Sequence, residues 1–152
     1  YNREILAEFT WGMSREDVRS LCTYAGLQFF LGGEDDGINI EDSRYRCYFD
    51  ETGGLSALTI QTGSSRDERF TVDKTTLEEV QQIVTDAGGT LTLLTPAGDN
   101  PWEIWQYADT AQGTLYWFTV FQGKVTVITE KQLTAATFDG QQEYKSVLLM
   151  EN

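Results

Sequence analysis

The chain has 152 residues, of which 24 are acidic, 11 are lysine or arginine and none is histidine, so its formal net charge is -13. Nucleic acids and anionic membranes are bound through lysine and arginine, and the charge therefore argues against both as partners. The sequence contains no apolar run long enough for a membrane-spanning helix, and its length fits one domain or two small repeats that share a core.

The first helix is expected directly after Ser14. The Ser14 hydroxyl can cap the new helix, and Asp17, three residues on, can return a hydrogen bond to the Ser14 backbone. Gly26 supplies a stop at the other end. Between cap and stop, apolar residues recur at helical spacing on one face: Val18, Leu21, Cys22 and Ala25.

A second helix of the same pattern is expected after Thr76. Thr76 and Glu79 form a capping-box pair, and Gly88-Gly89 ends the helix. Residues 4–9 are expected as a short strand or a lead-in to the first helix. The other apolar segments are separated by glycine-rich and acidic turns and are expected as strands: 27–31, a run that begins at Ile38, 44–49, 55–61, 90–94, 102–108, 114–121, 124–130 and 144–150.

The order of helix and aromatic hairpin occurs twice. Tyr48-Phe49 and Trp117-Phe118 each precede a glycine turn and a further apolar strand. This order favours an α+β fold of two tandem helix-plus-antiparallel-sheet repeats, with the helices on one face of the sheet. We place the first repeat in residues 1–65 and the second in 66–152, with the polar stretch 63–69 at the boundary; one continuous domain is the alternative.

The two-residue turn Gln122-Gly123 sets the register of the last hairpin, and so decides which side chains share a face. One face then carries Tyr116, Phe118, Val120, Val125 and Val127 and is expected to pack on a helix. Large aromatic residues remain on the other face, as they do on the neighbouring strand. We expect four of them to bind a partner: Trp105, Tyr107, Trp117 and Phe121. The alternative is that the C-terminal segment or the other repeat covers them.

The two cysteines are Cys22, on the apolar face of the first helix, and Cys47, in an expected strand, so they could meet in the core. An exported chain would join them in a disulfide, which we expect, and a cytosolic chain would keep two buried thiols. Two thiols without histidine do not complete a zinc ligand set, so no metal is expected. The acidic cluster Glu34-Asp35-Asp36 lacks the spacing of an EF-hand and is interpreted as a solvated turn.

The segment Phe9-x-Trp11-Gly12-Met13-Ser14-x-Glu16-x-Val18 resembles the helix start of β-lactamase-inhibitor-protein-like modules, which outer-membrane assembly lipoprotein E modules share. In these families a short helical pair packs on an antiparallel sheet, and the inhibitor proteins carry two such units in tandem. A cysteine after the helix and another in a following strand are also similar. The resemblance implies an exported protein that binds other proteins through an aromatic sheet face.

We therefore expect a non-catalytic protein-binding module, inhibitor-like or envelope-associated, without cofactors. It would lie outside the cell or in the cell envelope, with a signal or anchor removed. The absence of histidine excludes Ser-His-Asp and Cys-His catalytic sites. Two alternatives remain open: a carbohydrate- or ligand-binding domain that uses Trp102, Trp105 and Trp117 as stacking platforms, and a cytosolic acidic protein of the immunity type.

Overall fold

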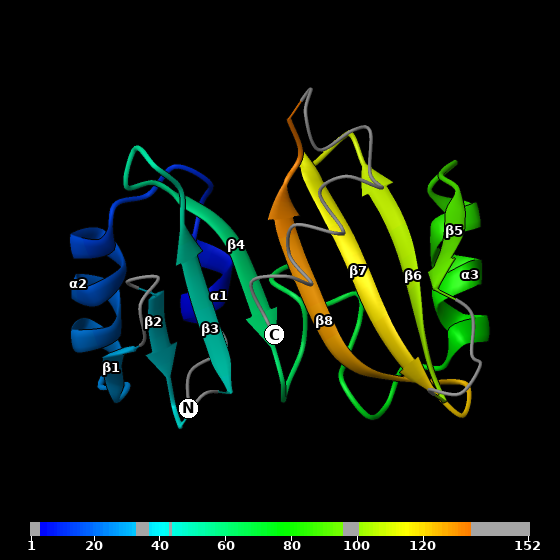
Figure 1. The fold of residues 1–152 in the computed structure, drawn as a ribbon, viewed down its shortest axis with the longest axis horizontal. Helices are drawn as coiled ribbons and strands as arrows, with labels where there is room; N and C mark the ends of the chain where they lie inside the picture. Colours follow the sequence, from blue (N-terminus) through cyan, green and yellow to red (C-terminus); the bar gives the residue numbers. More distant parts are fainter. Residues whose placement is uncertain (1–3, 33–36, 43, 96–100, 135–152) are drawn as a thin grey trace.

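The computed structural model of the chain describes residues 4–32, 37–42, 44–95 and 101–134. The helices in this part of the chain are α1 (Glu4–Glu8), α2 (Arg15–Ala25) and α3 (Leu77–Asp86) (Figure 1). The strands are β1 (Phe29–Gly32), β2 (Gly37–Ile40), β3 (Tyr45–Phe49), β4 (Leu55–Ile60), β5 (Leu91–Thr95), β6 (Trp102–Asp109), β7 (Thr114–Phe121) and β8 (Lys124–Gln132).

These strands form one antiparallel sheet of eight strands in the order β1-β2-β3-β4-β8-β7-β6-β5. β4 and β8 pair directly at its centre, where Leu58 lies opposite Glu130 and Ile60 lies opposite Ile128. β1 and β5 are therefore the two edges of the sheet, as Figure 1 shows.

The predicted caps at Ser14 and Thr76 and the stop at Gly26 are confirmed, and the return hydrogen bond from the Asp17 side chain to the Ser14 backbone stays a prediction. Ser14 accepts a hydrogen bond from the Asp17 backbone N–H at 3.1 Å, and Gly26 ends α2 in the left-handed conformation. Thr76 and Glu79 form a complete capping box at the start of α3. Residues 4–8 are helical, so the prediction of a strand there is wrong.

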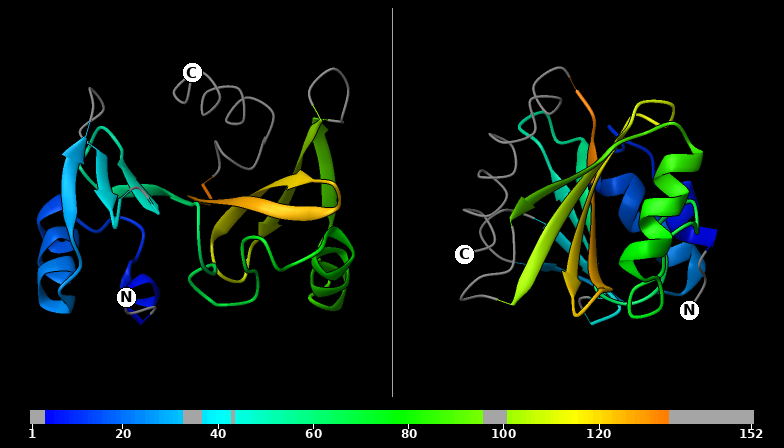
Figure 2. Two further views of the ribbon diagram at one scale, coloured as in Figure 1. Left: turned by 90° about the horizontal axis from the view of Figure 1, so that it is seen from below. Right: turned by 90° about the vertical axis from the view of Figure 1, so that its right-hand side faces the viewer.

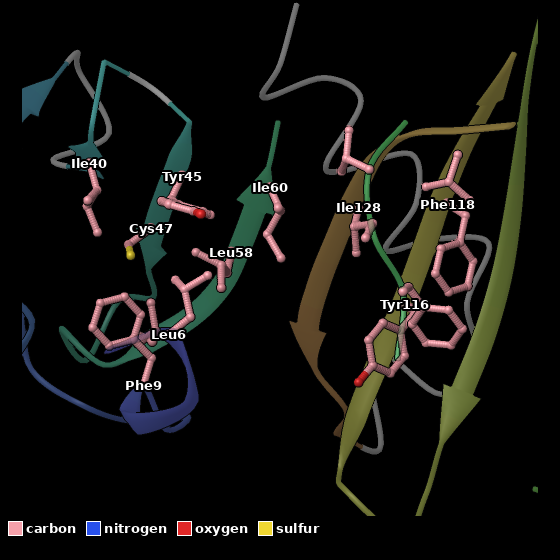
Figure 3. Close-up of a cluster of buried hydrophobic side chains, with 14 of the residues drawn as sticks. Leu6, Phe9, Ile40, Tyr45, Cys47, Leu58, Ile60, Tyr116, Phe118 and Ile128 are labelled. Atoms are coloured by element: carbon pink, nitrogen blue, oxygen red, sulfur yellow. The ribbon is translucent and has the colours of Figure 1, made fainter. Parts of the chain in front are cut away.

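All three described helices lie on the same side of the sheet (Figure 2). Val18 and Cys22 of α2 and Val80 and Val84 of α3 are buried there. They belong to one hydrophobic core that also includes residues of β2, β3, β4, β6, β7 and β8. Figure 3 shows part of it: Leu58, Ile60, Ile128, Tyr116 and Phe118 from the sheet, with Leu6 and Phe9 from the α1 region. We call the opposite side of the sheet its outer face.

The predicted fold class is wrong. We expected two tandem helix-plus-sheet repeats, but the strands form a single eight-stranded antiparallel sheet with short helices of 5, 11 and 10 residues. The pairing of β4 with β8 merges the expected two sheets, and the core on the helix side is continuous across that pairing. The boundary expected between residues 65 and 66 stays a prediction.

The hairpin of β7 and β8 follows the predicted register only near its turn. Phe121 lies opposite Lys124 and Val120 opposite Val125, as expected. The register then shifts, so that Thr119 pairs with Val127 instead of Thr126. This bulge places Ile128 on the core side in the position expected for Val127.

Candidate functional site

A row of side chains crosses the outer face from one edge of the sheet to the other. Residues paired across antiparallel strands point to the same side of the sheet, so the row follows from the strand register. It contains, in order from β1 to β5, Phe30, Asn39, Arg46, Thr59, Thr129, Trp117, Gln106 and Thr92. It runs without interruption across the pairing of β4 with β8.

None of the described strand residues that point to the outer face is acidic, although the chain carries 24 acidic residues. The basic residues on this face are Arg46, Lys124 and Lys131. Its large aromatic residues are Phe30, Tyr48, Trp102, Trp117 and Phe121. The outer face therefore differs in charge from the protein as a whole.

Aromatic contacts order several of these side chains. The Arg46 guanidinium lies 5.2 Å from the centre of the Tyr48 ring. The Trp102 and Phe121 rings are 5.1 Å apart at a tilt of 32°, and Trp102 is 42% exposed. Trp117 is buried, and its indole N–H donates to Gln106 Oε1 at 2.9 Å.

The structure separates the four predicted binding residues onto two faces. Trp105 and Tyr107 lie opposite Phe118 and Tyr116 on the core side, where Tyr107 is buried and Trp105 is half-buried. Trp117 and Phe121 point to the outer face. A single surface cannot present all four, and Trp102, which the binding prediction omitted, is the more exposed indole on the outer face.

A buried hydroxyl on the outer face is unsatisfied. Within the described part of the structure, Thr59 Oγ1 is a buried side-chain oxygen that has no hydrogen-bond partner, and Thr59 is 6% exposed. It lies on β4 at the centre of the sheet, between Arg46 and Thr129 in the row. A buried polar group without a partner costs free energy, so this hydroxyl lowers the stability of the sheet at its centre.

On the other side of the sheet, Arg66 forms a dense polar cluster. Its backbone N–H and its Nε donate to the two carboxylate oxygens of Glu130 at 2.9 and 2.8 Å. Its terminal nitrogens donate to the Phe9 carbonyl at 2.6 Å and to Thr114 Oγ1 at 3.2 Å. The guanidinium also lies 4.2 Å from the centre of the Trp11 ring. Arg66 thus connects the N-terminal segment to β7 and β8.

A second arginine forms the adjoining cluster. Arg69 donates to Asp67 and to Asp109, each at 2.6 Å. Asp67 also accepts hydrogen bonds from Ser65 Oγ at 2.7 Å and from the Tyr116 hydroxyl at 3.2 Å.

The ionisation of these groups follows from their surroundings. Burial raises the pKa of Glu130, and the charge and hydrogen bonds of Arg66 oppose that rise without cancelling it. Burial also tends to raise the pKa of Asp67, but hydrogen bonds from Ser65 and Arg69 outweigh it and lower the pKa below its usual value. Both carboxylates are held by arginine, an arrangement that stabilises the 63–76 segment against the sheet.

Both cysteines are buried thiols in the structure, so the expected disulfide between Cys22 and Cys47 is not present. Burial, together with the negative charge of Glu41, raises the pKa of Cys22 to about 11. Burial likewise raises the pKa of the Cys47 thiol. Both sulfurs are therefore protonated at neutral pH and poor nucleophiles.

The described residues were compared with the requirements of a metal site and of a membrane-spanning helix. They contain no group of three or more histidine, cysteine, aspartate or glutamate side chains that could hold a metal ion. No helix among them has the length and apolar character needed to cross a membrane. The acidic cluster at 34–36 and the expected strand at 144–150 lie outside the described residues.

Comparisons with known proteins add little. No protein-family model matches the sequence, and no curated protein matches it. Among solved structures, the chain is similar to YjgB, a DUF4309 family protein from Bacillus subtilis, with 15% sequence identity and a TM-score of 0.39. The match covers 70% of this chain and 64% of YjgB. At this identity and TM-score, the similarity carries no information on function.

The sequence interpretation missed the role of residues 65–69. It treated this stretch as a polar boundary, whereas Arg66 and Asp67 are the centres of the polar clusters. The basic residues of this stretch are both arginine, Arg66 and Arg69. That composition could have indicated buried ion pairs, because guanidinium groups are preferred over ammonium groups for partly buried ion pairs.

Proposed function

We propose that this protein is a non-catalytic binding module that docks another protein on the outer face of its sheet. The observation that carries the proposal is the row from Phe30 to Thr92, which crosses all eight strands without an acidic side chain on a protein of net charge -13. Centres of protein interfaces are depleted in charged residues and enriched in tyrosine, tryptophan and arginine. The outer face has this composition.

The size of the face fits such an interface. Seven spacings of about 4.8 Å between eight strands make the sheet roughly 34 Å wide, before twist is considered. A standard interface occupies about 800 Å² on each partner, which corresponds to a patch roughly 28 Å across. Across its strands, the outer face is thus wide enough for an interface of this size.

Three aromatic residues are the proposed contacts. Trp102 and Phe121 form a packed pair at one end of the face, and Tyr48 lies with Arg46 on β3. Trp117 is buried on the same face and its indole N–H is bonded to Gln106, so we assign it a positioning role. The partner fits best if it presents an apolar patch to these rings.

The resemblance of the Phe9–Val18 segment to protein-binding modules supports the same proposal. It also supports an exported or envelope-associated location, because the modules that share this helix start are exported. In those modules the partner binds the sheet and not the helices. The composition of the outer face supports the same mode of binding for this chain.

The test is affinity capture with the full chain, followed by binding measurements with the purified captured protein. The double variant Trp102→Ala/Phe121→Ala should weaken binding by about 2 kcal/mol or more, roughly 30-fold in Kd, as expected for central aromatic contacts. Leu93→Ala removes an apolar side chain that is 38% exposed on the helix side and serves as the matched control. Unchanged binding by the double variant would overturn the proposal, as would specific binding of glycans in place of a protein.

A further inference from the structure

We infer that the β1 edge is a second docking site, which takes an extended basic peptide segment as an added strand. This surface consists of β1 and the neighbouring face of α2, and it is distinct from the aromatic contacts on the outer face. Its partner is identified by chemistry: a strand with alternating apolar and cationic side chains.

The first observation is the concentration of exposed apolar side chains at this end of the molecule. Tyr24 is 89% exposed, Leu31 60% and Phe30 50%. The remaining large apolar residues that are exposed in the described structure are Leu93 and Trp102, on β5 and β6. α2 and β1 lie together at one end of the sheet in Figure 1. The three residues therefore present apolar surface around one strand.

The second observation is that β1 is an unprotected sheet edge. Among the described strands it pairs with β2 alone, and its four residues Phe29–Gly32 include neither a charge nor a proline. Natural edge strands are commonly protected by charged residues or proline, because exposed backbone groups attract further strands. β1 lacks both kinds of protection.

The register shows which backbone groups are available. The Gln28 carbonyl accepts a hydrogen bond from the Glu41 N–H at 2.8 Å, so residue 28 faces β2. Successive residues of a strand direct their N–H and C=O groups to opposite edges. Phe29 and Leu31 therefore direct theirs away from β2, where an added strand would meet them.

The third observation concerns two surface hollows along α2, the helix next to this edge. A surface hollow of about 720 Å³ between α1 and α2 is lined by Glu8, Met13, Asp17, Ser20, Leu21 and Tyr24. An adjoining hollow reaches β1 and holds one carboxylate and one guanidinium; it is lined by Glu16, Arg19, Ser20, Thr23, Tyr24 and Phe29. The first hollow combines apolar walls with two carboxylates. Lysine and arginine fit this combination, since each has an aliphatic stem and a cationic end.

Charge decides between a second copy of this chain and a basic partner. Two copies that met at β1 would each carry a net charge of -13. The sequence around the edge is also acidic: it has only Arg15 and Arg19 as basic residues between positions 8 and 42, against Glu8, Glu16, Asp17, Glu34, Asp35, Asp36, Glu41 and Asp42. Like charges oppose self-association and attract a cationic segment.

The added strand would pair antiparallel or parallel to β1 through the outward groups of Phe29 and Leu31. Its side chains would alternate between Phe30 on the outer-face side and Leu31 with Tyr24 on the helix side. Backbone bonds supply affinity in this mode of recognition, and the alternating side chains supply specificity.

The test uses a synthetic hexapeptide of alternating lysine and valine with the full-length protein. Amide exchange at Phe29 and Leu31 should slow on peptide addition, and Leu31→Lys should weaken binding about tenfold or more. Leu93→Lys, on the opposite edge strand, is the matched control and should bind like the wild type. A peptide methylated on alternate backbone nitrogens should not bind, because the strand-pairing donors are removed.

Several outcomes would overturn the inference. They are no detectable binding at millimolar peptide, equal binding of a glutamate–valine peptide, and equal binding by Leu31→Lys. A dimer of the protein that Leu31→Lys dissolves would overturn it in favour of self-association. Trp102→Ala/Phe121→Ala should leave peptide binding unchanged, so the failure of this inference and failure of the proposed function give different results.

Discussion

Replacing Arg66 with methionine should strongly destabilise the protein, because the change leaves Glu130 buried without its counter-charge. Glu130 is fully buried, and Arg66 supplies both a backbone and a guanidinium hydrogen bond to its carboxylate. Removal of one partner from a buried ion pair costs about 3–5 kcal/mol. For a chain of this size each kcal/mol lowers Tm by roughly 2–4 °C, so we expect a loss of roughly 6–20 °C.

The loss should depend on pH in a defined direction. Burial already raises the folded-state pKa of Glu130 above its ordinary value of 4.5, and without Arg66 the pKa rises further. A folded pKa above the unfolded one means that folding favours the protonated carboxyl. The variant therefore becomes less stable as pH rises through the folded pKa, and recovers as pH falls toward 4.5.

Urea and thermal denaturation across this pH range provide the assay. Arg44→Met removes an exposed arginine and should change stability by less than about 0.5 kcal/mol. The double variant Arg66→Met/Glu130→Leu should recover much of the loss, because no unpaired charge remains in the core. A loss below about 1 kcal/mol that does not change with pH would refute the reasoning, because the estimate assumes a buried charge left without a partner.

Three further predictions concern other parts of the fold. Thr76→Ala removes the cap of α3 and should cost about 1 kcal/mol in urea denaturation, with no change in the denaturant slope. The pKa of Asp67 is lowered in the folded protein, so the ionised carboxylate stabilises the fold at pH values above its ordinary pKa. This stabilisation is lost as pH falls through the folded-state pKa, and Asp67→Asn should therefore reduce the dependence of Tm on pH in the acid range. Cys22 and Cys47 should resist a thiol reagent in the folded protein at mildly alkaline pH, and both should react after unfolding without reductant. A native chain with no reactive thiols after unfolding would contradict that last expectation.

Local signals in the sequence predicted local structure well. Ser14 and Thr76 cap the helices that their spacing predicted, because the hydrogen bonds involved span only three residues. The turn at Gln122-Gly123 was recognised for the same reason, and its neighbours pair as expected. The short α1 was missed, since five residues give little periodicity to read.

The architecture could not be read in the same way, because it depends on contacts between distant residues. Residues 57–60 pair with 128–131, and nothing in either strand specifies the other. That pairing turns the expected two sheets into one. The bulge beside Thr119 also has no recognisable signal in the sequence. Because of it, Ile128 lies on the core side in the position expected for Val127.

The binding role of the aromatic residues stays a prediction, but the structure shows where they lie. Aromatic residues on both sides of the β6 and β7 pair were expected, and they are there. The sequence did not show which of these aromatic side chains are buried. In the structure Tyr107 and Trp117 are buried, and Trp102 is the exposed indole. The outer-face row also depends on the β4–β8 pairing, so no reading of single strands could reveal its continuity.

The central claim is that a protein partner docks on the outer face, and amide hydrogen exchange of the complex tests it most directly. The account predicts slower exchange on β3, β4, β6, β7 and β8, together with reduced solvent quenching of Trp102, while α2 and α3 exchange as in the unbound protein. Protection confined to the helices, with Trp102 quenched as before, would contradict the claim.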